Sequence, residues 1–207
     1  VMIGFVLGFL IAVVRSTADR QQDLRKGNPV GRFFLRFLNG FCKVYLTVFR
    51  GTPVIVQLLI FNFVIFTSLR GSGGVFFVAV LTFGLNSAAY VAEIFRSGIM
   101  SIDKGQFEAG RSLGFSYAST MIHIILPQAF KNVLPALGNE FIVLLKETSV
   151  VGYIAGQDLT RAATQIQSQT YQALFPMVSV AIIYLVMVMG LTKLVSLLER
   201  RLRNSEH

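Results

Sequence analysis

Four charged side chains lie within long apolar stretches of this chain, where an ionised group needs a partner or water. They are Glu93, Glu140, Lys146 and Glu147. A charge at the centre of a bilayer costs about 2.5–3.5 kcal/mol on insertion scales, so such residues face a bundle interior or a water-filled space. Glu93 stands three residues before Arg96. That spacing predicts an ion pair on one helix face, which would anchor the end of a span.

The other acidic residues allow two interpretations. Glu140 and Glu147 are seven residues apart, so they share one face of a helix. They could form a structural network between helices, with partners on a second subunit, or they could line a path for a polar solute. Carboxamides, hydroxyls and one carboxylate near the middle of a membrane can solvate such a solute. The candidate path residues are Gln57, Asn86, Glu140, Thr148 and Ser149.

The composition predicts an all-α integral membrane protein. Of the 207 residues, 54% are hydrophobic and 14% charged, and the mean hydropathy is +0.64. Soluble domains typically carry about 25% charged residues. The single cysteine, Cys42, excludes an internal disulfide, and no Cys/His cluster predicts a metal site. No GxxxxGK[ST] segment occurs, so we expect no nucleotide-binding loop and no catalytic residue in this chain.

Spanning a bilayer as a helix takes about 20 apolar residues. About five spans are expected, at 1–14, 44–69, 75–94, 136–155 and 175–198. The first is short, and we expect it to be the end of a helix whose start is missing. The second is interrupted by "RGTP" at 50–53, where the helix should kink or restart. There Thr52 is expected to cap the new helix and Pro53 to suit its first turn.

The basic residues predict the orientation of the spans. The segment 15–50, expected to be a cytoplasmic loop with its helix edges, holds eight Lys and Arg. The segment 96–131 and the C-terminal end hold four each, whereas the two outer loops hold one each. Cytoplasmic loops carry such an excess. The same asymmetry accounts for the net charge of +9 without nucleic acid.

The loop at 103–127 is polar and helical. Asp103, with Gln106 three residues later, predicts a helix start. Gly114 predicts its end, because glycine adopts the left-handed cap conformation without steric cost. A second helix is expected from 116 to 126, ending near Pro127. This helix–turn–helix could dock in a groove of a soluble partner or fold back on the membrane surface.

Its residues resemble the cytoplasmic EAA loop of ATP-binding cassette (ABC) import permeases. That motif reads E-A-A, three residues, G, nine residues, I, one residue, L-P. The matching positions are Glu108, Ala109, Gly114, Ile124, Leu126 and Pro127. Gly110 departs from it where the family has alanine, and glycine lowers helix propensity by about 1 kcal/mol. The chain is also similar to the branch that imports polar amino acids, through "FRGTPVIVQLLIF" (49–61), "NSAAYVAEIFRSGI" (86–99), "LPALGNEFIVLLKETSVVGYI" (134–154) and "DLTR" (158–161).

The resemblance implies a type I importer transmembrane domain of the MetI-like fold, occupying 1–207 as one domain in a bacterial inner membrane. The EAA loop and the C-terminus would be cytoplasmic. The implied partners are ABC ATPase subunits, a second permease subunit (identical or closely related), an extracytoplasmic amino-acid-binding protein and membrane lipid. ATP and Mg²⁺ would be bound by the ATPase, with no cofactor on this chain. The implied coupling residues are Glu108, Ala109, Gly110, Arg111, Gly114 and Pro127.

The substrate and two rival functions stay open at this point. Three acids against one base in the spans favour a cationic amino acid, while glutamine or histidine remains an alternative. One rival is a secondary transporter driven by an ion gradient, which should show internal symmetry. The other is a membrane scaffold that recruits a partner without transporting anything, which would need no polar patch at mid-membrane.

Overall fold

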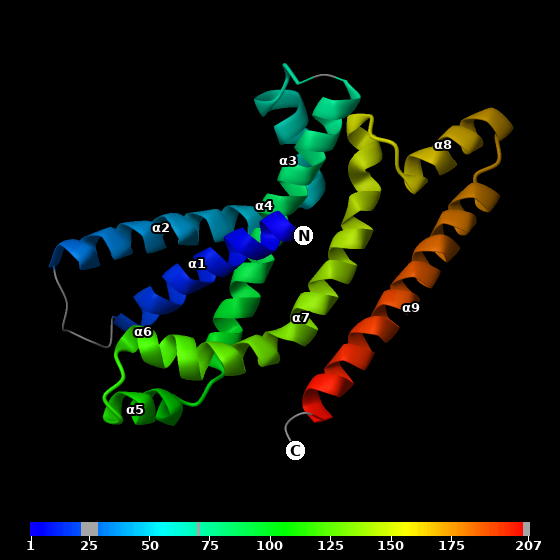
Figure 1. The fold of residues 1–207 in the computed structure, drawn as a ribbon. Coiled ribbons are helices and arrows are strands. Elements are labelled where there is room, and N and C mark those ends of the chain that lie inside the picture. The colour runs from blue at the N-terminus through cyan, green and yellow to red at the C-terminus, as the bar shows by residue number, and fades with distance from the viewer. Residues whose placement is uncertain (22–28, 70, 205–207) are drawn as a thin grey trace.

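The computed structural model describes residues 1–21, 29–69 and 71–204, and within these ranges the chain is helical without strands (Figure 1). Nine α-helices are connected by three π or 3-10 segments in this part of the chain. In order they are α1 (Met2–Gln21), α2 (Pro29–Gly51), α3 (Val54–Ile60), η1 (Phe61–Ile65), α4 (Ser72–Met100), α5 (Lys104–Ser112), α6 (Tyr117–Thr120), η2 (Met121–Ile125), α7 (Leu126–Glu147), η3 (Thr148–Ile154), α8 (Leu159–Thr170) and α9 (Leu174–Asn204).

Three helices, α1, α4 and α9, are long and apolar enough to cross a membrane. The pair α2–α3 passes the same test as one broken span, with a bend of 106°. The expected span at 136–155 falls on the later part of α7 and on η3, and this segment is not among the described helices that pass the test, so three or four spans are found where five were expected. The expected loop at 15–50 is wrong, because α1 continues to Gln21 and α2 already begins at Pro29. Apolar side chains on both helices pack against α4, and this tertiary contact stabilises helix where the basic residues suggested loop.

Small residues let α1 and α4 pack closely. Gly4, Gly8 and Ala12 follow one another at four-residue spacing on one face of α1. A Cβ on Gly8 would lie 2.7 Å from the Cβ of Val91 and 2.9 Å from the carbonyl oxygen of Ala88. The facing residues of α4 repeat the spacing: Gly84, Ala88 and Ala92. Such small-residue stripes let helix backbones approach within a membrane.

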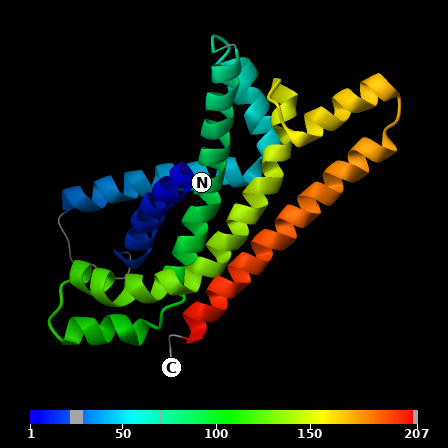
Figure 2. The same cartoon turned by 45° about the vertical axis from the view of Figure 1, so that its right-hand side comes forward.

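The break between α2 and α3 occurs at the predicted position, within "RGTP" (Figure 2). The predicted cap is wrong, however. Pro53 is the N-cap residue of α3, with extended backbone angles, and the Thr52 hydroxyl donates to the carbonyl of Val48, 2.8 Å away. The Thr52 side chain therefore bonds to the last turn of α2 and does not cap α3.

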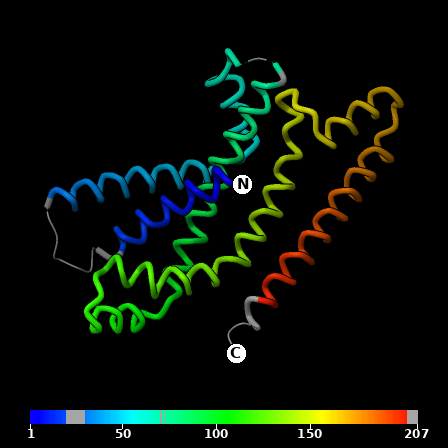
Figure 3. Tube along the Cα trace, in the orientation of Figure 1, coloured from blue at the N-terminus to red at the C-terminus, as the bar shows by residue number. Residues whose placement is uncertain are grey.

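Figures 1 and 3 show α9 running alongside α7, with α5 and α6 at one end of these helices and α8 at the other. None of the residues in the apolar window of α9 is buried within the chain. Its outer surface is thus available to lipid or to another protein.

Candidate functional site

The first helix of the 103–127 hairpin begins and ends as predicted. The Asp103 carboxylate caps α5 by accepting a hydrogen bond from the Gly105 amide at 2.6 Å. Gly114 has φ +86°, in the left-handed region. The amide of Phe115 bonds to the carbonyl of Gly110, and the amide of Gly114 bonds to that of Arg111, both at 3.1 Å. This pair of bonds is the Schellman arrangement, which satisfies the last carbonyls of a helix.

The two arms of the hairpin are in close contact. Gly110 is buried, and a Cβ there would lie 2.7 Å from Cγ2 of Thr120 on α6. Phe107 and Tyr117 pack edge to face with ring centroids 5.2 Å apart. Glycine at the position where the EAA pattern has alanine therefore has a packing role. It allows α5 to approach α6 more closely than a side chain would permit.

The second arm does not stop at Pro127, contrary to the prediction. Ser116 caps α6 by accepting a hydrogen bond from the Ser119 amide. The chain then passes through η2, where the Leu126 amide bonds to Met121 five residues back, and continues as α7. Pro127 stands at the start of α7, where its missing N–H costs little. The hairpin is thus continuous with α7.

A small apolar cluster joins the hairpin to the body of the protein. Ile99 and Ile102, at and after the end of α4, are buried with Ile125 and Ala129. Side chains from both arms pack on this cluster: Phe107, Met121 and Ile124. Displacement of the hairpin would therefore displace the ends of α4 and α7 as well.

The opposite side of the hairpin is exposed. Five of the six predicted coupling residues are exposed: Glu108, Ala109, Arg111, Gly114 and Pro127. Leu113, at the turn, is 77% exposed, and Phe115 and Ile122 of the hairpin are exposed as well. The Arg111 guanidinium donates to the carbonyl of Phe115 at 3.0 Å and so holds the turn. Exposed apolar side chains on the same hairpin as the Glu108 carboxylate form a surface suited to a protein partner.

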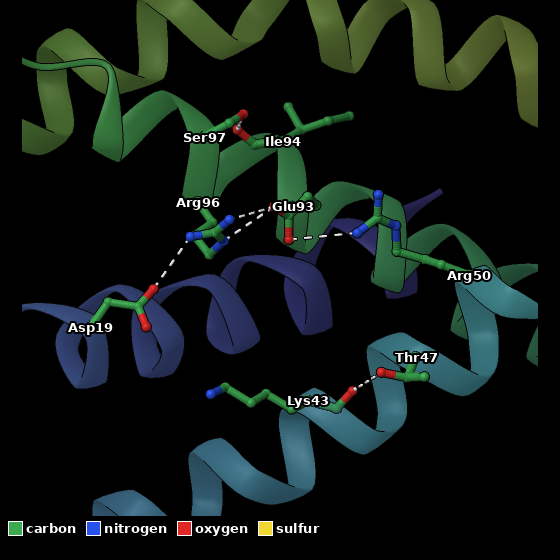
Figure 4. A network of polar contacts seen from close by, with 8 residues as sticks. All are labelled: Asp19, Lys43, Thr47, Arg50, Glu93, Ile94, Arg96 and Ser97. Atoms are coloured by element: carbon green, nitrogen blue, oxygen red, sulfur yellow. Dashed lines mark hydrogen bonds and ion pairs between the residues drawn. The ribbon is translucent and has the colours of Figure 1, made fainter.

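An ionic network joins three helices near this end of the molecule (Figure 4). Glu93 of α4 accepts from Arg96 at 2.7 Å, which confirms the predicted i,i+3 pair. Sequence reasoning missed the two remaining partners. Arg50 of α2 lies 3.7 Å from Glu93, and Asp19 of α1 lies 3.3 Å from Arg96. No local spacing signals these pairs, because they join residues far apart in the chain.

Gln57 and Asn86 meet at the α2–α3 break. Both side chains are buried, and the Asn86 amide donates to the Gln57 carbonyl oxygen at 3.0 Å. The Gln57 amide donates in turn to the carbonyls of Phe49 (2.9 Å) and Thr52 (3.0 Å). These bonds satisfy carbonyls that the break would otherwise leave unpaired. The two carboxamides predicted for the polar path thus stabilise the bend.

The remaining predicted path residues are spread along α7 and η3. Glu140 has the buried Ser87 hydroxyl as its hydrogen-bonding partner. Thr148 lines a mostly apolar cavity of about 680 Å³ between α4 and α7, whereas Ser149 lines a separate cavity of about 410 Å³ beside α8 that has more polar residues in its lining. Gln57, Asn86 and Glu140 line neither cavity. The structure joins Gln57 to Asn86 and places Thr148 and Ser149 at two different cavities.

No group of three or more His, Cys, Asp or Glu side chains within the described ranges could hold a metal ion. The candidate functional features in this part of the chain are the exposed hairpin, the ionic network and the polar residues between α4 and α7. Sequence reasoning also missed the Gly4–Gly8 pair, although its four-residue spacing was visible.

The chain is similar to several transport proteins. It is 37% identical over 202 residues to a putative glutamine transport system permease protein of Rickettsia typhi, covering 98% of this chain and 85% of the relative. It is 44% identical over 162 residues to the arginine transport system permease protein of Bacillus subtilis, covering 78% of this chain and 74% of the relative.

Solved structures agree with these relatives. A crystal structure of an amino acid ABC transporter with histidines matches with a TM-score of 0.81 and 42% identity, covering 97% of this chain and 86% of that one. The inward-facing methionine ABC transporter MetNI matches at a TM-score of 0.74 and 20% identity, covering 97% and 88%, which supports the fold alone. The family model described as "binding-protein-dependent transport system inner membrane component" matches residues 27–204. The chain therefore belongs to this family of inner-membrane transport components.

Proposed function

We propose that this chain is the permease subunit of an ATP-driven importer of polar amino acids. The observation that carries the proposal is the exposed hairpin at 103–127, which bears the EAA pattern and continues without a break into α7. The fold and the relatives named for glutamine and arginine transport support the same function.

The coupling step follows from the geometry of the hairpin. A separate ATPase subunit binds ATP and Mg²⁺, and it contacts the hairpin at the surface around Glu108, Leu113 and Gly114. Because the hairpin is packed on Ile99 and Ile102 and is continuous with α7, its displacement tilts α4 and α7 together. Alternation between inward-open and outward-open states then needs only a difference in ATPase affinity between the two states.

We further propose that the substrate passes beside Glu140 and Ser87. This carboxylate and hydroxyl lie between α4 and α7, the two helices that the hairpin would move. Gln57 and Asn86 would contribute indirectly, by holding the bend of α2–α3. Thr148 and Ser149 lie in η3, beyond α7 and toward α8, and would meet the substrate at the outer end of the path.

The proposed assembly contains two permease subunits, two ATPase subunits and an extracytoplasmic binding protein. The hairpin and the C-terminus face the cytoplasm in this arrangement. The basic residues at the hairpin end of the molecule support that orientation.

Charge reversal at the hairpin tests the docking role. Glu108→Lys should abolish ATP-dependent amino acid uptake in proteoliposomes and release the ATPase on size-exclusion chromatography, while the permease remains folded. Glu199→Lys, a reversal on α9 outside the hairpin, is the control and should leave both unchanged. If Glu108→Lys retains ATPase assembly and uptake, the docking role is wrong. Loss of uptake on adding a proton uncoupler at constant ATP would instead favour a gradient-driven transporter.

A further inference from the structure

Four phenylalanine side chains of α2 project from one side of the helix and are between 65% and 75% exposed. At 100° per residue they occupy a single face, which Val44 and Val48 extend toward the α2–α3 break. The members of this aromatic face are Phe33, Phe34, Phe37 and Phe41.

A basic edge runs alongside the aromatic face. Arg36 and Lys43 are exposed, and neither forms an ion pair within the ranges that the structure describes. Gly40 lies between them on the helix surface, and nothing is found within 4 Å of the position that its Cβ would take. The surface between the two cationic groups is therefore open to a ligand.

The rest of the chain fixes the direction in which these two faces point. Leu46 is buried in a cluster with Ala89 and Ala92 of α4, and Tyr45 and Phe49 pack against it. Cys42, one turn before Leu46, is buried too. The remaining side of α2 thus packs on α4 and α1. The exposure of the aromatic face and of the basic edge follows from this packing.

We propose that α2 binds anionic phospholipid, with acyl chains against the aromatic face and the headgroup phosphate between Arg36 and Lys43. Helices that combine an apolar face with a basic one bind at membrane interfaces, and lysine and arginine side chains there attract anionic lipids. The leaflet concerned is the one on the side of α5 and α6, because α1 ends beside α6 and α2 begins only eight positions later (Figure 1).

Charge decides between lipid and a second copy of the chain as the occupant. The chain carries 19 Lys and Arg against 10 Asp and Glu. Asp19 and Glu93 already pair with Arg96 and Arg50, and Asp103 caps α5. A second copy would therefore bring few free carboxylates to the basic edge, whereas each anionic headgroup brings a phosphate. The phenylalanine rings have no polar atoms that would require a protein partner.

A fluorescence experiment tests the lipid assignment. The chain contains no tryptophan, so Phe37→Trp places a reporter on the aromatic face. The permease–ATPase complex is reconstituted in phosphatidylcholine nanodiscs containing brominated phosphatidylglycerol or, separately, brominated phosphatidylcholine. Emission of the same complex with the native Phe37 is subtracted. Phe41→Trp serves as a second reporter should the first variant fail to fold.

The proposal predicts quenching by both lipids, with phosphatidylglycerol favoured about thirtyfold at equal mole fraction, the combined effect of two basic side chains near a membrane surface. Adding Arg36→Gln and Lys43→Gln should abolish this preference and leave the quenching. Lys131→Gln with Lys193→Gln removes two exposed charges elsewhere and should leave the preference intact. Absence of quenching would mean that protein covers the face. Equal quenching by both lipids in the Phe37→Trp complex with Arg36 and Lys43 intact would also overturn the proposal. So would a loss of the phosphatidylglycerol preference in the Lys131→Gln, Lys193→Gln control as large as the loss in the Arg36→Gln, Lys43→Gln variant.

Discussion

The contact between α1 and α4 gives a sharp prediction for Gly8→Ala. The added Cβ would lie 2.7 Å from Val91 and 2.9 Å from the carbonyl oxygen of Ala88, whereas ordinary contacts begin at 3.4 Å. A valine side chain could rotate away, but a backbone carbonyl within a helix cannot. Relief of the clash therefore moves α1 outward by about half an ångström, a gap that already forfeits about a quarter of the dispersion energy of the atoms concerned.

Overpacking of this kind typically costs about 1–3 kcal/mol. For a chain of this size that corresponds to a fall in Tm of about 2–4 °C per kcal/mol. We expect the purified complex containing Gly8→Ala to melt several degrees below the native complex in a thermal unfolding assay.

The matched control for Gly8→Ala is Gly190→Ala on α9. Nothing lies within 4 Å of the position that a Cβ on Gly190 would take, so this variant should melt no lower than the native complex. If Gly8→Ala is as stable as Gly190→Ala, then α1 does not pack on α4 through its glycine stripe, and the reasoning fails.

Three further substitutions test the hairpin, the bend and the ionic network. Gly110→Ala gains about 1 kcal/mol in helix propensity but loses about 1–3 kcal/mol through the clash with Thr120, so faster hydrogen exchange at 103–127 is expected. Unchanged or slower exchange would contradict that packing. Gln57→Leu leaves two carbonyls and the Asn86 amide without the hydrogen-bond partner that Gln57 provides. Each unpaired group lowers the stability by about 1–3 kcal/mol, so this variant should lower Tm more than Gly8→Ala does. Glu93→Gln should cost about 1–2 kcal/mol, between the values for exposed and buried pairs. Since salt screens such pairs, the Tm difference from the native complex should shrink at high ionic strength, and a constant difference would argue against an ionic role.

Helical continuity across Pro127 changes how force can travel from the hairpin. Had the second arm ended there, a flexible joint would separate the ATPase-docking surface from α7. The observed π turn at Met121–Ile125 instead accommodates the proline without ending the helix. A tilt of the hairpin is thus passed directly to the helix that carries Glu140.

Local patterns were sufficient to predict several features of this protein. The long continuous apolar runs predicted membrane helices, since a helix satisfies its backbone hydrogen bonds within its own segment in lipid. Asp103 and Gly114 correctly marked the ends of α5, because a carboxylate cap and a left-handed glycine act within one helical turn. The Glu93–Arg96 pair followed from i,i+3 spacing for the same reason.

Features that depend on distant residues were decided only by the tertiary structure. The basic segment from 29 to 43 is helical because the apolar side of α2 packs on α4, and no local signal announces that contact. Asn86 and Gln57, expected on a solute path, bond to the carbonyls left by the α2–α3 break, since that break brings residues 29 positions apart within 3.0 Å. Spacing along a chain determines what a helix can present on each face, but only packing determines which face meets which.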